Sequence, residues 1–232
     1  MKFKFKYAFV IVLSMVILSC GDDDGSPAGE PDSGTDFEGN ATAEYTLSFE
    51  TSFSEEMFPE EYPSNPSFGP VVAIIHSPNI NVFQTGSVAN DGLAAYAESG
   101  DVDALVTALE SQQGQSEGLF LIQTASNASA VGTSSFDITF TPTRTRVTFL
   151  AKLNPSPDWF VGAASLDIVD GNTLKEEIQT GLVLLDAGTK AGETYESSSV
   201  SENNTIGICV DAPYAGDGPF VESLGNLTIA RN

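Results

Sequence analysis

The stretch "NPSPDWFVGAASLDIVDGN", residues 154–172, places Asp158 between a proline-broken turn and the only tryptophan of the chain, Trp159. Aspartate is common in turns because its side chain can hydrogen-bond nearby backbone N–H groups. Its carboxylate is also a hard oxygen ligand of the kind that calcium takes in sets of six to eight. We expect Trp159 to pack into the core while Asp158 turns outward, because neighbours on an extended chain face opposite sides. The residues alone leave Asp158 open as a turn residue or a ligand.

A second acid joins Asp158 if the strands pair as their pattern indicates. Segments 136–140 and 147–153 alternate between apolar and polar residues and flank the polar "TPTRTR", which predicts a hairpin. That hairpin sets Asp137 opposite about Leu150 and near the loop that carries Asp158. Two carboxylates in one rim of loops repel each other unless a cation lies between them. The pattern therefore leaves a calcium site on these loops and the absence of one as equal alternatives.

Other catalytic chemistry has little support in the sequence. The chain has one histidine, His76, which follows the apolar run "VVAII". That context favours a hydrogen-bonded structural imidazole over a general base. Zinc is disfavoured because its usual sites need several His or Cys ligands. Cys209 lies in an apolar, strand-like run, which predicts a buried, inert thiol.

The hydrophobic pattern predicts an all-β fold. Period-two alternation recurs along the chain, as at Tyr45, Leu47 and Phe49. Two short segments, "DGLAAYAESG" and "DVDALVTALE", instead have helical spacing, with Gly100 ending the first and Asp101 as the N-cap of the second. We therefore predict an antiparallel β-sandwich with a short helical insertion between early strands.

The N-terminus has the pattern of an export signal. Residues 1–19 combine three lysines with an apolar run too short for an ordinary membrane span. The run ends in "ILSC", which resembles the lipobox of bacterial lipoproteins and predicts acylation of Cys20; simple cleavage nearby is the alternative. The expected location is the outer membrane, through the lipid anchor.

Residues 20–43 are rich in Gly, Ser, Pro and acids, which predicts a disordered tether before one domain at residues 44–232. The "DDD" at 22–24 resembles the acidic export tags of surface lipoproteins in the Bacteroidota, although a merely acidic linker fits as well. The net charge of −23 excludes nucleic acid as a partner. Solubility alone explains most of that negative charge, and the excess of carboxylates also suits a protein that faces solvent containing divalent cations.

"PSPDWFVG", followed by "SLDIVDGN" and "LLDAGTKAG", resembles the signature of the spondin N-terminal domain family. The resemblance continues through "YTLSFETSFSEEMFPEEYP", "AIIHS" and "FQTGSVANDGL" and covers nearly all of residues 45–231. It implies a C2-like calcium-binding β-sandwich associated with extracellular matrix and cell adhesion. It further implies one calcium ion with Asp158 and Asp186 as ligands and an acid of the preceding strand as a third. Asp137 is the match for that third acid, two residues beyond the expected position.

The chain also departs from the family pattern. The family's DAGTD is here "DAGTK", so that Lys190 replaces an acid beside the proposed metal site. Lys190 either weakens metal binding or points away.

The leading functional hypothesis is a non-catalytic, lipid-anchored module on the cell surface. Its calcium-organised loops would bind an extracellular protein or glycan that the sequence does not identify. A carboxylate-based hydrolase acting on extracellular glycans is the first alternative, because paired acids can do acid and base work without histidine. A structural envelope protein is the second.

Overall fold

A computed structural model describes residues 37, 41–114, 116, 118–192, 194–196, 200–210, 213–214 and 223–232. The predicted signal peptide, Cys20 and most of the predicted tether up to residue 43 lie outside the described residues. Within the described part of the chain, no helix has the length and apolar character needed to cross a membrane.

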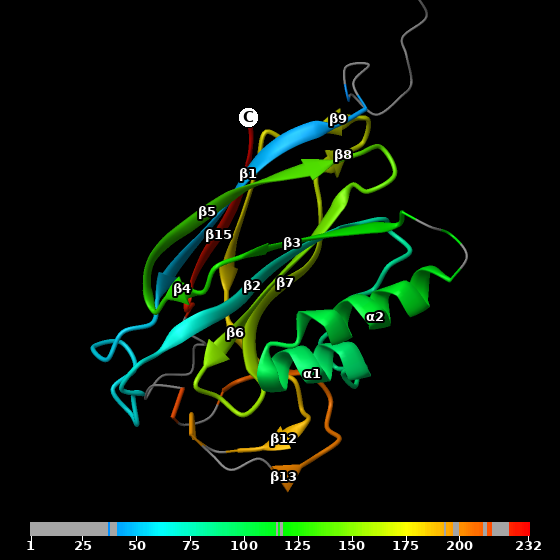
Figure 1. Cartoon of the computed structure of the whole chain (residues 1–232). Coiled ribbons are helices and arrows are strands. Elements are labelled where there is room, and N and C mark those ends of the chain that lie inside the picture. The colour runs from blue at the N-terminus through cyan, green and yellow to red at the C-terminus, as the bar shows by residue number, and fades with distance from the viewer. Residues whose placement is uncertain are drawn as a thin grey trace, which may run out of the picture. The chain divides into compact units, whose positions relative to one another are not determined.

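The domain is built on two antiparallel sheets (Figure 1). The four-stranded sheet has the order β10 (Glu177–Leu182), β15 (Gly225–Arg231), β1 (Ala43–Ser52), β5 (Val131–Phe140). The seven-stranded sheet has the order β14 (Gly207–Ile208), β11 (Leu184–Asp186), β7 (Trp159–Asp167), β6 (Arg146–Asn154), β2 (Ser67–His76), β3 (Phe120–Ala125), and β4 (Ala128–Ser129) also pairs with β2. Two small ladders join β8 (Val169–Asp170) to β9 (Thr173–Leu174), and β12 (Lys190–Ala191) to β13 (Val200–Ser201).

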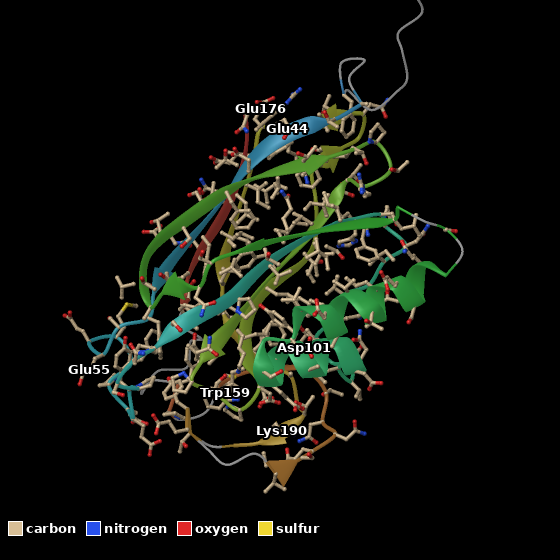
Figure 2. The ribbon with its side chains drawn as sticks, viewed as in Figure 1. Glu44, Glu55, Asp101, Trp159, Glu176 and Lys190 are labelled. Atoms are coloured by element: carbon tan, nitrogen blue, oxygen red, sulfur yellow. The ribbon has the colours of Figure 1, made fainter. Side chains whose placement is uncertain are left out.

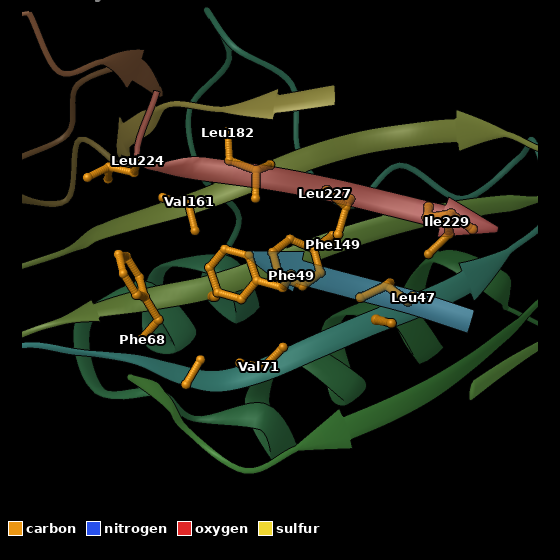
Figure 3. Packing of buried hydrophobic residues seen from close by; sticks show 14 of the residues in the cluster. Leu47, Phe49, Phe68, Val71, Phe149, Val161, Leu182, Leu224, Leu227 and Ile229 are labelled. Carbon is orange, nitrogen blue, oxygen red and sulfur yellow. The ribbon is translucent and has the colours of Figure 1, made fainter. Parts of the chain in front are cut away.

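The main core fills the space between the two sheets. Leu47 and Phe49 project from β1 and meet Val71, Phe149 and Val161 of the seven-stranded sheet, all of them fully buried (Figure 3). Burying each such side chain contributes about 1.5–3 kcal/mol relative to leaving it exposed. The period-two pattern of the sequence therefore marks the inward faces, and the predicted β-sandwich is confirmed.

Two helices cover the outer face of the seven-stranded sheet. They are α1 (Asp91–Ser99) and α2 (Val102–Gln113), which lie between β2 and β3 in the chain (Figure 1). The α1 helix ends at Gly100 in the left-handed conformation, and Asp101 accepts a hydrogen bond from the Ala104 N–H as the N-cap of α2. Val72 alternates to this outer face of β2 and packs in the second core with Leu93. The predicted helical insertion is confirmed, and it forms a third layer.

The predicted hairpin is wrong. β5 pairs with β1, which sets Asp137 opposite Thr46, whereas β6 pairs with β2 and β7 in the other sheet. The "TPTRTR" segment therefore carries the chain from one sheet to the other, and only an isolated bridge joins Thr141 to Arg144. Alternation predicts which face of a strand is buried, but a strand of either sheet of a sandwich turns its apolar face to the same core. The pattern therefore does not identify the neighbouring strand.

His76 is a structural residue in the middle of this fold. Its side chain is fully buried, and Nδ1 lies 2.8 Å from the Ser77 carbonyl, which can only accept, so that Nδ1 carries the proton. Nε2 is then the acceptor for the Thr148 hydroxyl at 2.9 Å, and Thr148 Oγ1 itself accepts from the Ser165 N–H. This chain of bonds lies where the register between β6 and β7 shifts. The expected hydrogen-bonded imidazole is confirmed.

This arrangement predicts a loss of stability in mild acid. Burial lowers the pKa of His76 below its ordinary value; the hydrogen bond to the Ser77 carbonyl opposes this shift, and the nearby positive charge of Arg146 adds to it. Below about pH 6.5 the unfolded chain then binds a proton that the folded chain does not, so stability falls as pH falls through that value, by up to about 1.4 kcal/mol per pH unit.

Urea unfolding at about pH 7 and about pH 5.5 measures this loss. The His76→Gln variant should be less stable at the higher pH but should lose less stability on acidification. Equal losses in the two proteins would contradict the assignment, because the carboxylates common to both titrate alike.

Candidate functional site

The turn before β7 fixes the position of Asp158. The two prolines of "NPSPD" lack the N–H groups that would continue the ladder of β6. Between them, the Ser156 hydroxyl donates to the Leu153 carbonyl at 2.6 Å and accepts from the Trp159 N–H at 3.1 Å. One side chain therefore closes the turn from both sides and sets Asp158 at the start of β7.

The Asp158 carboxylate is buried and holds the loop that follows β11. Its Oδ2 accepts hydrogen bonds from the Thr189 N–H at 2.7 Å, the Thr189 hydroxyl at 3.0 Å and the Lys190 N–H at 2.9 Å. Its Oδ1 is buried and has no hydrogen-bond partner among the described residues. The expectation that Asp158 turns outward is wrong, because three donors of a facing loop draw the carboxylate inward.

Trp159 packs into the core as expected. Its side chain is 5% exposed, and its ring meets the Tyr195 ring edge-on, with 5.4 Å between the ring centroids. The indole N–H makes no well-formed hydrogen bond among the described residues. It lies near enough to the Asp186 carboxylate to lower the pKa of that group slightly.

Asp186 holds the other side of the same loop. It is the last residue of β11, it pairs directly with Trp159, and its Oδ1 accepts from the Gly188 N–H at 2.6 Å. Burial raises the pKa of Asp186, the Gly188 hydrogen bond opposes this shift, and the negative charge of Asp158 adds to it. The structure therefore brings Asp158 and Asp186 together, as the family resemblance implied.

Gly188 lets the loop approach its neighbour closely. Its φ of +72° favours glycine, and an added Cβ would lie 2.6 Å from the Asn204 carbonyl oxygen. The Asn204 N–H donates to the Gly188 carbonyl at 2.8 Å. The "DAG" motif thus combines an aspartate that accepts a hydrogen bond from its own loop with a position where only glycine fits, because any side chain would clash with Asn204.

Asp137 does not join this pair. It lies within β5 of the other sheet, where its Oδ1 accepts from the Thr46 hydroxyl at 2.9 Å. Thr46 Oγ1 also lies 2.8 Å from Asn232 Oδ1, beside the end of the sandwich that carries Glu44 and Glu176. Figure 2 shows Trp159 and Lys190 at the opposite end. The hairpin on which the placement of Asp137 depended is absent, and the described residues contain no group of three or more His, Cys, Asp or Glu side chains able to hold a metal.

Two lysines, Lys190 and Lys152, lie beside Asp158 and Asp186. Only Lys190 belongs to a motif of the sequence. Lys190 Nζ points to α1, where it lies 3.1 Å from Glu98 Oε2, and it donates to Ser201 at 3.2 Å. Lys152 is buried on β6, where Nζ donates to the Ser156 carbonyl at 3.0 Å. Burial lowers the pKa of Lys152 to about 8, and the charges of Asp158 and Glu98 oppose this shift. The position of Lys152 inside the apolar run "VTFLAKLN" could have identified it from the sequence, since a buried charge requires partners.

A cavity of about 260 Å³ opens beside Asp186. Its wall includes Trp159, Asn204, Ile208 and Tyr214. Cys209 also lines this cavity and is half-buried against the main core, where the sequence predicted a buried thiol. Asp158 is not part of the wall, so only one of the two carboxylates lines this cavity.

Comparison with known proteins identifies similar chains. Residues 43–219 match the family model Spondin_N. The chain is 28% identical to Spondin-2 of Rattus norvegicus over 197 residues, which is 82% of this chain and 60% of the rat protein. It is 30% identical to Spondin-2 of Homo sapiens over 73% of this chain and 53% of that protein. It is also 30% identical to Spondin-1 of Homo sapiens, over 67% of this chain and 20% of that protein. The chain thus spans about half or less of the length of most of these relatives.

The loop contacts predict that Asp158 stabilises the fold. Asp158→Ala leaves two partly buried N–H groups and the hydroxyl of Thr189 without their acceptor, and removes a partner charge from Lys152. We expect a loss of about 3 kcal/mol in the free energy of unfolding, measured by urea denaturation. The control Asp170→Ala removes an exposed carboxylate of β8 and should change stability by less than about 0.5 kcal/mol. Similar values for both variants would mean that the carboxylate contributes nothing to holding the loop.

Proposed function

Because the chain belongs to the spondin N-terminal domain family, we propose that it acts as an extracellular adhesion or ligand-binding module. The observation that supports this most directly is the "PSPDW" aspartate, Asp158, which fixes the "DAGTK" loop beside an open cavity. A loop held by buried hydrogen bonds keeps its shape before a ligand arrives, and such preorganisation lowers the entropic cost of binding.

A binding role is favoured over a carboxylate-based hydrolase. Hydrolysis of a glycan needs two carboxyl groups on either side of the reacting bond. Here only Asp186 lines the cavity, while Asp158 lies behind the loop with one oxygen committed to three donors. Saturable binding of an extracellular protein or glycan without chemical change would support the proposal, and turnover of a glycan would contradict it.

We propose that acylation of Cys20 attaches this module to the outer membrane. The motif "ILSC" and the Gly-, Ser- and Pro-rich residues after it support the proposal. Several acyl chains on one residue hold a protein to a membrane far better than a single chain does.

The lipid anchor predicts that Cys20→Ala releases the protein from the membrane. Membrane fractionation and incorporation of labelled palmitate, compared between the native chain and the variant, measure this. Cys209→Ala is the matched control, because Cys209 is the only other cysteine of the chain. Membrane attachment of Cys20→Ala, with no label in the native chain, would contradict the anchor.

We further propose that Asp158 and Asp186 hold one calcium ion. The buried, unpartnered Oδ1 of Asp158 fits a hard cation, as does the rise in the pKa of Asp186 to which Asp158 contributes. Lys190 does not stand in the way, because its ammonium group pairs with Glu98. Backbone carbonyls and water would have to complete the six to eight oxygens. A bound ion would neutralise the two carboxylates and tie the loop to the start of β7.

Calcium should therefore raise the melting temperature of the native chain. Binding to the folded state alone adds about 2.7 kcal/mol at a hundredfold excess over Kd. Asp186→Asn should abolish this rise and leave the metal-free melting temperature unchanged or higher, because the amide oxygen can still accept from Gly188 while the repulsion from Asp158 is gone.

Calorimetry in EDTA and in excess calcium compares the two proteins. Asp137→Asn is the control, since that residue lies in the other sheet and should keep the full calcium shift. Equal shifts in the native chain and Asp186→Asn would end the calcium proposal.

A further inference from the structure

The cavity beside Asp186 carries negative charge that its own wall does not neutralise. Asp186 lies in the wall, and the charges of Asp158 and Glu202 both act on it. None of the described residues that line the cavity is basic. The nearest lysine of the loop, Lys190, is turned to Glu98 on α1. The cavity therefore attracts a cation from outside.

Exposed aliphatic side chains lie in the wall of this cavity and on segments that pair with the wall or adjoin it in the chain. Four of the seven large apolar side chains that the described residues expose lie here, and each is between 44% and 66% exposed: Val88, Val200, Ile208 and Val210. Ile208 and Val210 belong to the wall itself. Val88 bridges to the wall residue Thr205, and Val200 pairs with Ala191, the neighbour of the wall residue Gly192. Single exposed apolar residues are ordinary, but a group around one acidic cavity marks an interaction surface.

We propose that this surface, defined by Asp186 in the cavity and by Val88, Ile208 and Val210 around it, binds a basic extracellular protein by receiving one of its lysine or arginine side chains. The inference rests on the proposed role as an extracellular binding module and names the chemistry of its partner.

The shape and polarity of the cavity suit such a side chain. A volume of about 260 Å³ accommodates one side chain rather than a whole folded ligand. The aliphatic stem of lysine or arginine packs on apolar residues while its charged end pairs with a carboxylate. The net charge of −23 steers a basic partner toward this chain.

A neutral sugar fits the same cavity less well. Sugars in proteins commonly lie against an exposed aromatic face, but Trp159 and Tyr214 are only 5% and 2% exposed. The exposed side chains at the rim are branched aliphatic residues, which a protein partner would cover. The observations therefore favour a protein over a glycan, and the sugar becomes one outcome of the test.

Gly207 allows the cavity to be filled without disturbing the fold. It lies in the edge strand β14 and pairs directly with Asp186, so a side chain placed there would project on the same face as the Asp186 carboxylate. An added Cβ would meet only the Thr205 carbonyl oxygen, at 3.9 Å. Gly207→Phe should therefore block the cavity, and Gly207→Ala at the same position is the matched control that leaves most of it open.

The experiment titrates the purified chain with the peptide acetyl-Gly-Leu-Arg-Leu-Gly-amide, its lysine counterpart, and its citrulline counterpart, which has the shape of arginine without the charge. Fluorescence of the only tryptophan, Trp159, reports binding, because Trp159 lines the cavity and the peptides contain no aromatic residue. Calorimetric titration confirms the affinities. EDTA is present throughout, so that calcium cannot occupy Asp186.

We expect the arginine and lysine peptides to bind about tenfold or more tightly than the citrulline peptide, and their binding to weaken as salt is added. Gly207→Ala should retain this binding, and Gly207→Phe should lose it with an unchanged melting temperature. Equal binding of the arginine and citrulline peptides, equal binding by Gly207→Phe, or no binding of any peptide at millimolar concentration would overturn the inference. So would a fluorescence change with methyl glycosides but not with the basic peptides.

The proposed function is tested separately in the same proteins. Gly207→Ala leaves Asp158, Asp186 and most of the cavity in place and should still show the calcium-dependent rise in melting temperature. Failure of the peptides with that rise intact would overturn this inference alone. Binding of the peptides without any calcium effect would support the inference and remove the calcium proposal.

Discussion

The geometry of this end of the sandwich depends on the hydrogen bonds that the Asp158 carboxylate accepts. One oxygen of a fully buried side chain takes the N–H groups of Thr189 and Lys190 and the hydroxyl of Thr189. These bonds join the start of β7 to the loop after β11. The β7–β11 ladder itself ends at the pair of Trp159 and Asp186. Charge-assisted bonds of this kind are stronger than neutral ones, and an empty acceptor would leave buried donors unsatisfied. The loop therefore has one position.

The same carboxylate explains the two lysines near it. A buried carboxylate is costly unless it is paired, and Lys152 on the helix-facing side of β6 supplies a neighbouring positive charge. Glu98 of α1 acts on Lys152 and forms the ion pair with Lys190. The two lysines therefore lie between the carboxylate of Asp158 and that of Glu98 in the helical layer, or pair with one of them. The lysine that replaces an acid in the "DAGTK" motif has a structural role here, since it ties the loop to α1.

What could be predicted from the sequence was local. Period-two alternation identified the inward faces of β1 and β15, and capping by Asp101 and Gly100 identified both helices, because neighbouring residues determine these features. The partner of β5 could not be found in this way, since alternation is satisfied by any neighbour that buries the same face. Asp137 was misplaced for that reason. The inward turn of Asp158 was also missed, because its donors come from a loop more than thirty residues further along the chain.

The site thus has two sides with different electrostatic character. Toward the helices, Asp158 and Glu98 are offset by Lys152 and Lys190, and this internal balance fixes the loop without help from outside. Toward solvent, Asp186 faces a cavity whose wall contains no base among the described residues, with the charge of Glu202 nearby. A fixed loop that presents uncompensated charge loses little conformational entropy on binding, so more of the interaction energy appears as affinity. The ion pairs on the helix-facing side fix the loop, and this fixed loop lets Asp186 on the solvent-facing side discriminate between a cation and a neutral group of the same shape.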